Sequence, residues 1–147
     1  MAHLCARFLW RFFDVTDDAV RAVSAITHAH QTSTEACVRI VHVARALVDG
    51  MSVGDAVAMG GVDAEKPRGS ISSGGDVLHT YEAALWCLAN TSSYAECVLA
   101  AVNLGDDTDT TAAVAGALAG IVYGFDGIPS SWIDALRGKD VIEACLP

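Results

Sequence analysis

Apolar residues along this chain recur every three or four positions, which is the spacing that places them on one face of an α-helix. The clearest example is a predicted helix at residues 32–49. Its apolar face comprises Cys37, Ile40, Val41, Ala44, Leu47 and Val48. No segment shows the strict alternation of apolar and polar residues that is typical of strands. The pattern therefore predicts an all-α fold.

Capping residues and breakers divide the chain into a series of short helices. Thr32 with Glu35, and Ser93 with Glu96, have the spacing of capping boxes that start helices. Pro129 suits the first position of a late helix. The predicted helices lie at about 3–13, 17–25, 32–49, 52–59, 77–89, 93–104, 107–124 and 129–136, with a final turn at 140–145.

Two further expectations concern individual elements. In the helix at 77–89, the apolar residues predicted to be buried are Leu78, Tyr81, Leu85 and Leu88. On the helix at 32–49, Glu35 and Arg39 are spaced to form a surface ion pair. Residues 60–75 contain five Gly, three Ser and one Pro, and predict a flexible, functional loop. With 147 residues, the chain has room for one core, so we expect a single domain over residues 1–147.

Charge and cysteine content narrow the class of protein. The formal net charge is −9 and no basic run occurs, which argues against nucleic acid and anionic membrane as partners. The five cysteines include no Cys-x-x-Cys pair. We expect them to be reduced and to act as small buried apolar side chains. The start of the chain has no signal-peptide pattern, and the longest uncharged run, 110–125, is too short to span a bilayer. We therefore expect a soluble cytoplasmic protein.

The densest group of potential ligands lies at residues 106–111, where three Asp and three Thr fill six positions. Their hard oxygen atoms suit Mg²⁺, Mn²⁺ or Ca²⁺ better than zinc or copper. Asp107 and Asp109 can converge on one cation before the helix becomes regular, with Thr110 on the same side. The same residue types often cap helices, so capping is the alternative interpretation. A helix N-terminus repels a cation, so further ligands from elsewhere are expected.

A glycine repeat follows this acidic cluster. Gly116, Gly120 and Gly124 occur every fourth position and share one face of the predicted helix. Glycine costs about 1 kcal/mol relative to alanine inside a helix, a cost that close approach by another helix would explain. We therefore predict close helix packing along this face, which would fix the direction in which the acidic end points.

The segments described so far resemble the ADP-ribosylglycohydrolase family. The matching stretches are LGDDTDTTAAVAGALAGIVY at 104–123, SGGDVLHTYEAALW at 73–86, ITHAHQTSTEAC at 26–37 and IPSSWIDAL at 128–136. They occur in the family's order, and the likeness covers roughly residues 16–147. The resemblance implies a compact, orthogonal all-α bundle. It also implies an enzyme that uses two Mg²⁺ ions to hydrolyse the glycosidic bond between ADP-ribose and a protein side chain or small molecule.

The resemblance also implies ligands for the metal ions. Asp107, Asp109 and Thr110 match the family's metal ligands for Mg²⁺ or Mn²⁺, and the two aspartates would be the catalytic residues. Asp106 is better explained as part of the helix cap. The family's other ligand segment, which resembles Thr-Asp-Asp-Thr, has no counterpart in this chain. Thr16 begins a superficially similar stretch, but that stretch aligns with a different family region and receives no ligand assignment.

Residues that would contact the substrate follow from the same matches. His28 would lie beside bound ADP-ribose, and Gly74 and Gly75 would line its pocket. Without the resemblance, His28 and His30 would be read as an exposed capping loop. Asp76 stands where many relatives place an aromatic residue that could stack on adenine, which argues against adenine stacking at that position.

Three functional hypotheses follow. In the first, the chain is the C-terminal half of an ADP-ribosylglycohydrolase and is inactive alone because it holds half of the dimetal site. In the second, it is a non-catalytic helical remnant that binds a ligand or oligomerises. In the third, it is an acid-capped scaffold without a ligand. We expect a homodimer, since an apolar stripe near the start could cover a face of a second copy. That stripe comprises Leu4, Phe8, Trp10 and Phe12.

Overall fold

The computed structural model describes residues 15–145. Its α-helices are α2 (Asp17–Ala25), α3 (Gln31–Val48), α4 (Val53–Met59), α5 (Val77–Ala89), α6 (Tyr94–Val102), α7 (Thr108–Tyr123), α8 (Ser130–Ala135) and α9 (Lys139–Cys145). Two short 3₁₀ helices join them, η1 (Arg68–Ser70) and η2 (Phe125–Gly127). Residues 15–145 form no strand, so the all-α prediction is confirmed. The helix predicted at residues 3–13 and its apolar stripe lie outside the described residues.

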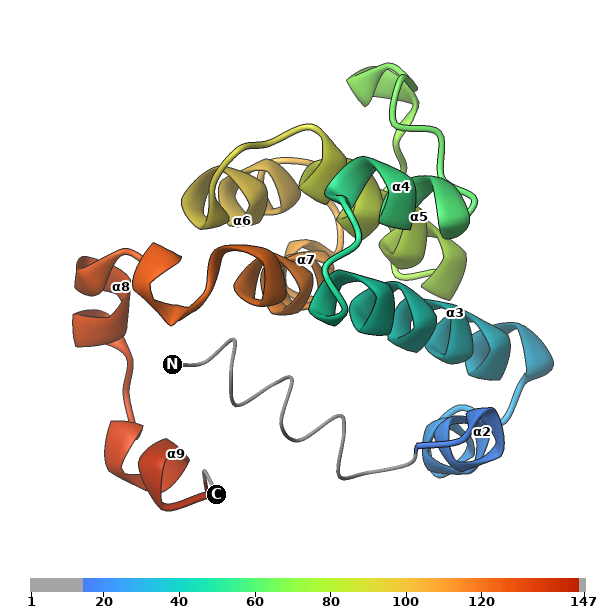
Figure 1. Ribbon diagram of the computed structural model, residues 1–147, viewed down its shortest axis with the longest axis horizontal. Coiled ribbons are helices and arrows are strands. Elements are labelled where there is room, and N and C mark those ends of the chain that lie inside the picture. The colour runs from blue at the N-terminus through green and yellow to red at the C-terminus, as the bar shows by residue number, and fades with distance from the viewer. Residues whose placement is uncertain (1–14, 146–147) are drawn as a thin grey trace.

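Helix α5 is the centre of the core. It packs against α3, α4, α6 and α7 (Figure 1). Tyr81, Leu85 and Leu88 are buried as predicted. Leu78 was predicted to be buried but is 45% exposed. It lies in the first turn, and burial along α5 begins only at Thr80, where the neighbouring helices cover it.

Helix α3 buries the expected face only in its second half. Ala44, Leu47 and Val48 are buried as predicted. Cys37, Ile40 and Val41 are half-buried instead. In the first half, the buried residues are Thr34, Ala36 and Val38. Helix α2 packs on α3, a contact between helices that the spacing of apolar residues does not indicate.

The start of α3 also differs from the prediction. The helix begins at Gln31, and the ring nitrogen Nδ1 of His30 accepts a hydrogen bond from the Thr32 N–H at 3.2 Å, so the capping box predicted at Thr32 is wrong. Glu35 pairs with Arg21 of α2, with 2.8 Å between Oε1 and Nε, rather than with Arg39. The Arg21 guanidinium holds the pKa of the Glu35 carboxyl below its ordinary value. Glu35 therefore pairs with Arg21 of a neighbouring helix and not with Arg39 of its own helix.

Side chains cap three other helices close to their predicted starts. Thr16 and Ser52 cap α2 and α4 through bonds to backbone N–H groups. Ser93 caps α6 by accepting from the Glu96 N–H, although the Glu96 carboxylate accepts from Ser92. Pro129, predicted inside α8, lies just before it because its ψ of 127° is extended and not helical.

The long loop at residues 60–75 is tied to α5 by hydrogen bonds. The Tyr81 hydroxyl donates to the Gly60 carbonyl, and the Trp86 indole N–H donates to the Lys66 carbonyl, each at 2.8 Å. Lys66 also pairs with Glu82 of α5 at 2.7 Å. These bonds fix the approach of the loop to the region around Ser73.

The glycine repeat of α7 has more than one explanation. A Cβ at Gly116 would lie 3.4 Å from the Tyr94 hydroxyl and from a Val98 methyl group, so α6 does pack closely there. Among the described residues, nothing lies within 4 Å of a Cβ at Gly120, and the prediction of close packing fails at that position. Gly124 ends the helix with a φ of 72°, a conformation that favours glycine.

The C-terminal helices make few contacts with the core. The Trp132 ring of α8 meets the Tyr94 ring of α6 edge-on, with centroids 6.2 Å apart. Helix α9 stands away from the other helices (Figure 1). Within residues 15–145, no helix combines the length and apolar character that crossing a bilayer requires.

Two of the predicted buried cysteines are indeed in the core. Cys87 and Cys97 are free and fully buried, whereas the free Cys37 is half-buried. Burial raises the pKa of the Cys87 thiol to about 12, so it remains protonated at neutral pH. These two residues therefore act as small apolar side chains.

Candidate functional site

The acidic segment is held in place by Ser73 at the end of the long loop. The Asp107 N–H donates to the Ser73 carbonyl at 3.1 Å, and the Ser73 hydroxyl donates to the Gly105 carbonyl at 2.8 Å. Ser73 is 2% exposed, so these bonds are shielded from water. Gly105 and Asp106 have φ values of 100° and 53°, which turn the chain into α7. Two segments distant in sequence are thus locked together.

Asp107 occupies the N-cap position of α7, but its side chain makes no capping hydrogen bond. Asp107 is half-buried, so a carboxyl group without a cap bond remains available at the mouth of the helix. Capping therefore does not explain why an acidic residue stands at this position.

Asp107 and Asp109 lie two residues apart at the start of α7. The neighbouring Asp107 side chain is the largest cause that holds the pKa of Asp109 below its ordinary value, and the backbone N–H groups of Thr110 and Asp109 act in the same direction. Two neighbouring acidic groups favour either a shared proton or a bound cation. Asp109 and Thr110 are exposed, so this pair is open to solvent.

One of the two loop glycines borders the acidic segment. A Cβ at Gly75 would lie 3.4 Å from Asp107 Oδ2, so Gly75 lies beside the Asp107 carboxyl. A Cβ at Gly74 would instead lie 3.7 Å from Nδ1 of His79, which pairs with the Ser72 hydroxyl at 3.2 Å. The sequence did not single out Ser73 or His79, because only the folded loop shows what they contact.

His28 is not joined to the cluster. Its side chain is exposed, and its Nδ1 lies 3.0 Å from the hydroxyl of the adjacent Thr27. Across residues 15–145, no hydrogen bond or ion pair links His28 or His30 to the acidic pair. The structure therefore places Gly75 beside Asp107, and within residues 15–145 no bond joins His28 to either residue.

The donor set fits a hard divalent cation but supplies few ligands. Asp107, Asp109 and Thr110 offer carboxylate and hydroxyl oxygens, which Mg²⁺ and Mn²⁺ prefer. Within the described part of the chain, no three His, Cys, Asp or Glu side chains come together as a metal-binding group. An octahedral Mg²⁺ shell would need water or further groups beside these residues.

A larger side chain at position 75 should weaken cation binding at this site. In Gly75→Val, the new side chain would crowd Asp107 Oδ2, and we expect Mn²⁺ to bind about tenfold more weakly, by titration calorimetry. Gly69→Val in the same loop is the control, because nothing described lies within 4 Å of a Cβ there. Equal affinities for the two variants would show that Gly75 does not border the cation site.

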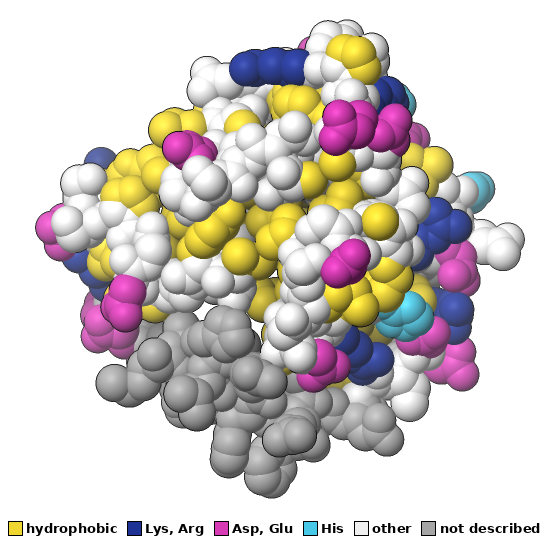
Figure 2. All heavy atoms as spheres, turned by 45° about the horizontal axis from the view of Figure 1, so that its top comes forward, with side chains coloured by type: hydrophobic (Ala, Val, Ile, Leu, Met, Phe, Trp, Pro, Cys, Tyr) yellow, Lys and Arg dark blue, Asp and Glu magenta, His cyan; other side chains and the backbone are white. Residues whose placement is uncertain are grey.

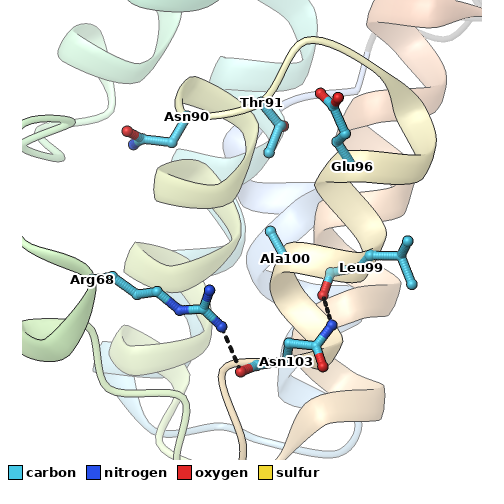
Figure 3. A pocket seen from close by; sticks show the side chains of 7 residues that line it. All are labelled: Arg68, Asn90, Thr91, Glu96, Leu99, Ala100 and Asn103. Carbon is cyan, nitrogen blue, oxygen red and sulfur yellow. Dashed lines mark hydrogen bonds between the residues drawn. The ribbon is translucent and has the colours of Figure 1, made fainter.

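A hollow of about 820 Å³ lies between η1, α5 and α6 (Figure 3). Its lining comprises Arg68, Asn90, Thr91, Glu96, Leu99, Ala100 and Asn103. Arg68 donates to the Asn103 carbonyl at 2.8 Å and so ties η1 to the end of α6. No residue of the acidic segment lines this hollow, which is therefore separate from the candidate metal site.

Comparison with known proteins identifies similar sequences and one similar structure. A family model described as ADP-ribosylglycohydrolase matches residues 9–146. The ADP-ribosylarginine hydrolase Tri1 of Serratia proteamaculans (strain 568) is 45% identical over 78 residues, which are 53% of this chain and 21% of that protein. The ADP-ribosyl-[dinitrogen reductase] glycohydrolase of Rhodospirillum rubrum is 31% identical over 126 residues, which are 82% of this chain and 43% of that protein.

A solved structure shares the fold. It is titled "ADP-ribosylglycohydrolase-related protein complex" and superposes with a TM-score of 0.77 at 30% identity, covering 89% of this chain and 51% of that one. The chain thus spans less than half the length of the two curated relatives, and about half of the solved structure.

Proposed function

Because the chain belongs to the ADP-ribosylglycohydrolase family, we propose that it takes part in hydrolysing the glycosidic bond between ADP-ribose and a protein side chain. Two relatives are named for ADP-ribosylarginine and for ADP-ribosylated dinitrogen reductase. Arginine is therefore the acceptor side chain that we propose to test first. ADP-ribose, or a protein that carries it, is the proposed partner.

One observation carries this proposal: the Asp107 carboxyl, at the N-cap of α7, makes no capping hydrogen bond and borders Gly75, which has no side chain. We propose that Asp107, Asp109 and Thr110 hold a Mg²⁺ or Mn²⁺ ion. Such an ion would polarise the ribose oxygens and lower the pKa of a bound water. The Asp107 side chain first, and then the backbone N–H groups of Thr110 and Asp109, lower the pKa of Asp109, which suits a carboxylate ligand.

The loop at residues 60–75 would provide the space for the substrate. Gly75 lacks a side chain, so ADP-ribose could approach the Asp107 carboxyl closely, and we propose that Gly74 lines the same pocket. Ser73 holds that loop against the acidic segment, which fixes the distance between the two walls of the proposed site. We propose that the exposed His28 contacts ADP-ribose directly.

We further propose that this ligand set is half of a dinuclear centre. The support is that residues 15–145 contain no metal-binding group of three His, Cys, Asp or Glu side chains. The remaining ligands would then come from groups that these residues do not supply. Turnover by the chain alone should accordingly stay at the background rate.

Titration calorimetry with Mn²⁺, with and without ADP-ribose, tests the proposed function. We expect Mn²⁺ to bind and ADP-ribose to bind only when Mn²⁺ is present, while ADP-ribosylarginine is not hydrolysed. Absence of binding by both ligands would contradict the proposed function. Hydrolysis that EDTA abolishes would contradict only the half-site proposal, because a complete centre would then be present.

A second candidate is a non-catalytic module that forms a homodimer. Several large apolar side chains are exposed, among them Leu99 and Val102 of α6 and Val141 of α9, at 48%, 43% and 62%. Figure 2 shows hydrophobic side chains open to solvent between scattered acidic and basic groups. Sedimentation of the same samples separates the candidates: a dimer without Mn²⁺ binding favours the module, and a monomer at high concentration contradicts it.

A further inference from the structure

Thr111 carries a buried hydroxyl group without a hydrogen-bond partner among the described residues. The residue is 0% exposed. Other buried hydroxyls are satisfied, since Thr34 donates to the Gln31 carbonyl at 3.0 Å and Ser73 donates to the Gly105 carbonyl at 2.8 Å. An unpartnered buried hydroxyl destabilises a fold, and valine would fill the same space without that cost. Packing alone therefore does not require threonine here.

The place of Thr111 in α7 relates this hydroxyl to the acidic pair. It follows Asp107 by four residues, and side chains of a helix tilt toward its N-terminus. The Thr111 side chain thus lies over the turn that Asp107 begins. The Asp107 carbonyl is the usual acceptor for a helical threonine at this spacing, yet it accepts the Thr111 backbone N–H at 3.2 Å and not the hydroxyl.

We propose that Thr111 is a positioning residue for the cation site. In the cation-bound protein, its hydroxyl donates a hydrogen bond to the Asp107 carboxylate and fixes the orientation in which that carboxylate binds the ion. This inference rests on the proposed role of Asp107 as a ligand. Residues that hydrogen-bond to a metal ligand orient that ligand. Their loss typically lowers metal affinity by about 10- to 100-fold.

Mn²⁺ titration of the full chain, combined with thermal unfolding, tests this role. In Thr111→Val, we expect Mn²⁺ affinity to fall about 10- to 100-fold, while the melting temperature without metal stays the same or rises. Thr111→Ser keeps the hydroxyl and should retain the affinity of the wild type. The control Thr34→Val loses a satisfied bond, so it should melt earlier and bind Mn²⁺ normally.

The outcomes separate this inference from the proposed function. If the wild type binds Mn²⁺ and Thr111→Val binds it equally well, Thr111 is only a core residue and the inference is overturned. If Thr111→Ser is as weak as Thr111→Val, the hydroxyl is not the group responsible, which also overturns it. If the wild type itself does not bind Mn²⁺, both the proposed ligand set and the role of Thr111 are wrong.

Discussion

Leu85→Ala is expected to lower the free energy of unfolding by about 2–5 kcal/mol. Leu85 is 0% exposed and lies on α5, the helix that packs against α3, α4, α6 and α7. Its truncation leaves a cavity that the surrounding helices can fill only in part. Since folded domains are stable by about 5–15 kcal/mol, this single change removes a large share of the total.

Leu78→Ala on the same helix is the matched control. Leu78 is 45% exposed, so its truncation should change stability by no more than about 0.5–1 kcal/mol. Urea denaturation gives both free energies from the midpoints and slopes of the transitions. Similar losses for the two variants would contradict the arrangement in which α5 is buried from Thr80 onward.

Asp107→Asn and Asp109→Asn should each weaken Mn²⁺ binding by on the order of 100-fold or more. Changing a residue that hydrogen-bonds to a metal ligand lowers metal affinity by about 10- to 100-fold. Removing the ligand itself should lower the affinity at least as much. Each aspartate supplies a separate carboxylate in the proposed ligand set, and asparagine removes its negative charge. Titration calorimetry, or the spin-resonance signal of free Mn²⁺, measures the loss.

Asp106→Asn is the control for charge. It removes the same negative charge one residue earlier, and asparagine tolerates the φ of 53° that Asp106 adopts. We expect Mn²⁺ affinity to change by less than about threefold, since an exposed charge outside the ligand set acts only through screened attraction. Equal weakening by all three variants would mean that general acidity and not a defined site attracts the ion.

Periodicity and turn chemistry predicted much of the fold. The bounds of α5 and α7 follow from apolar spacing and from the glycine that ends α7. The errors arose where distant parts of the chain decide the outcome. Glu35 pairs with Arg21 of α2, and His30 caps α3, although histidine is not a favoured cap. Leu78 has the spacing of a buried residue but lies beyond the neighbouring helices.

Candidate ligands can be named from the sequence, but their arrangement cannot. The hard oxygen donors at Asp107, Asp109 and Thr110 are visible in the sequence. The contact between Gly75 and Asp107 depends on Ser73, whose two hydrogen bonds join segments more than thirty residues apart. The unpartnered hydroxyl of Thr111 likewise appears only when the packing of α7 is known.

Anomalous diffraction from crystals of the chain grown with Mn²⁺ tests the central claim most directly. We expect a manganese peak at the start of α7, within bonding distance of the carboxylates of Asp107 and Asp109 and beside Thr110, and no such peak in crystals of Asp109→Asn. A peak at another position, with the start of α7 empty, would contradict the assignment of these residues as the metal ligands of an ADP-ribosylglycohydrolase site.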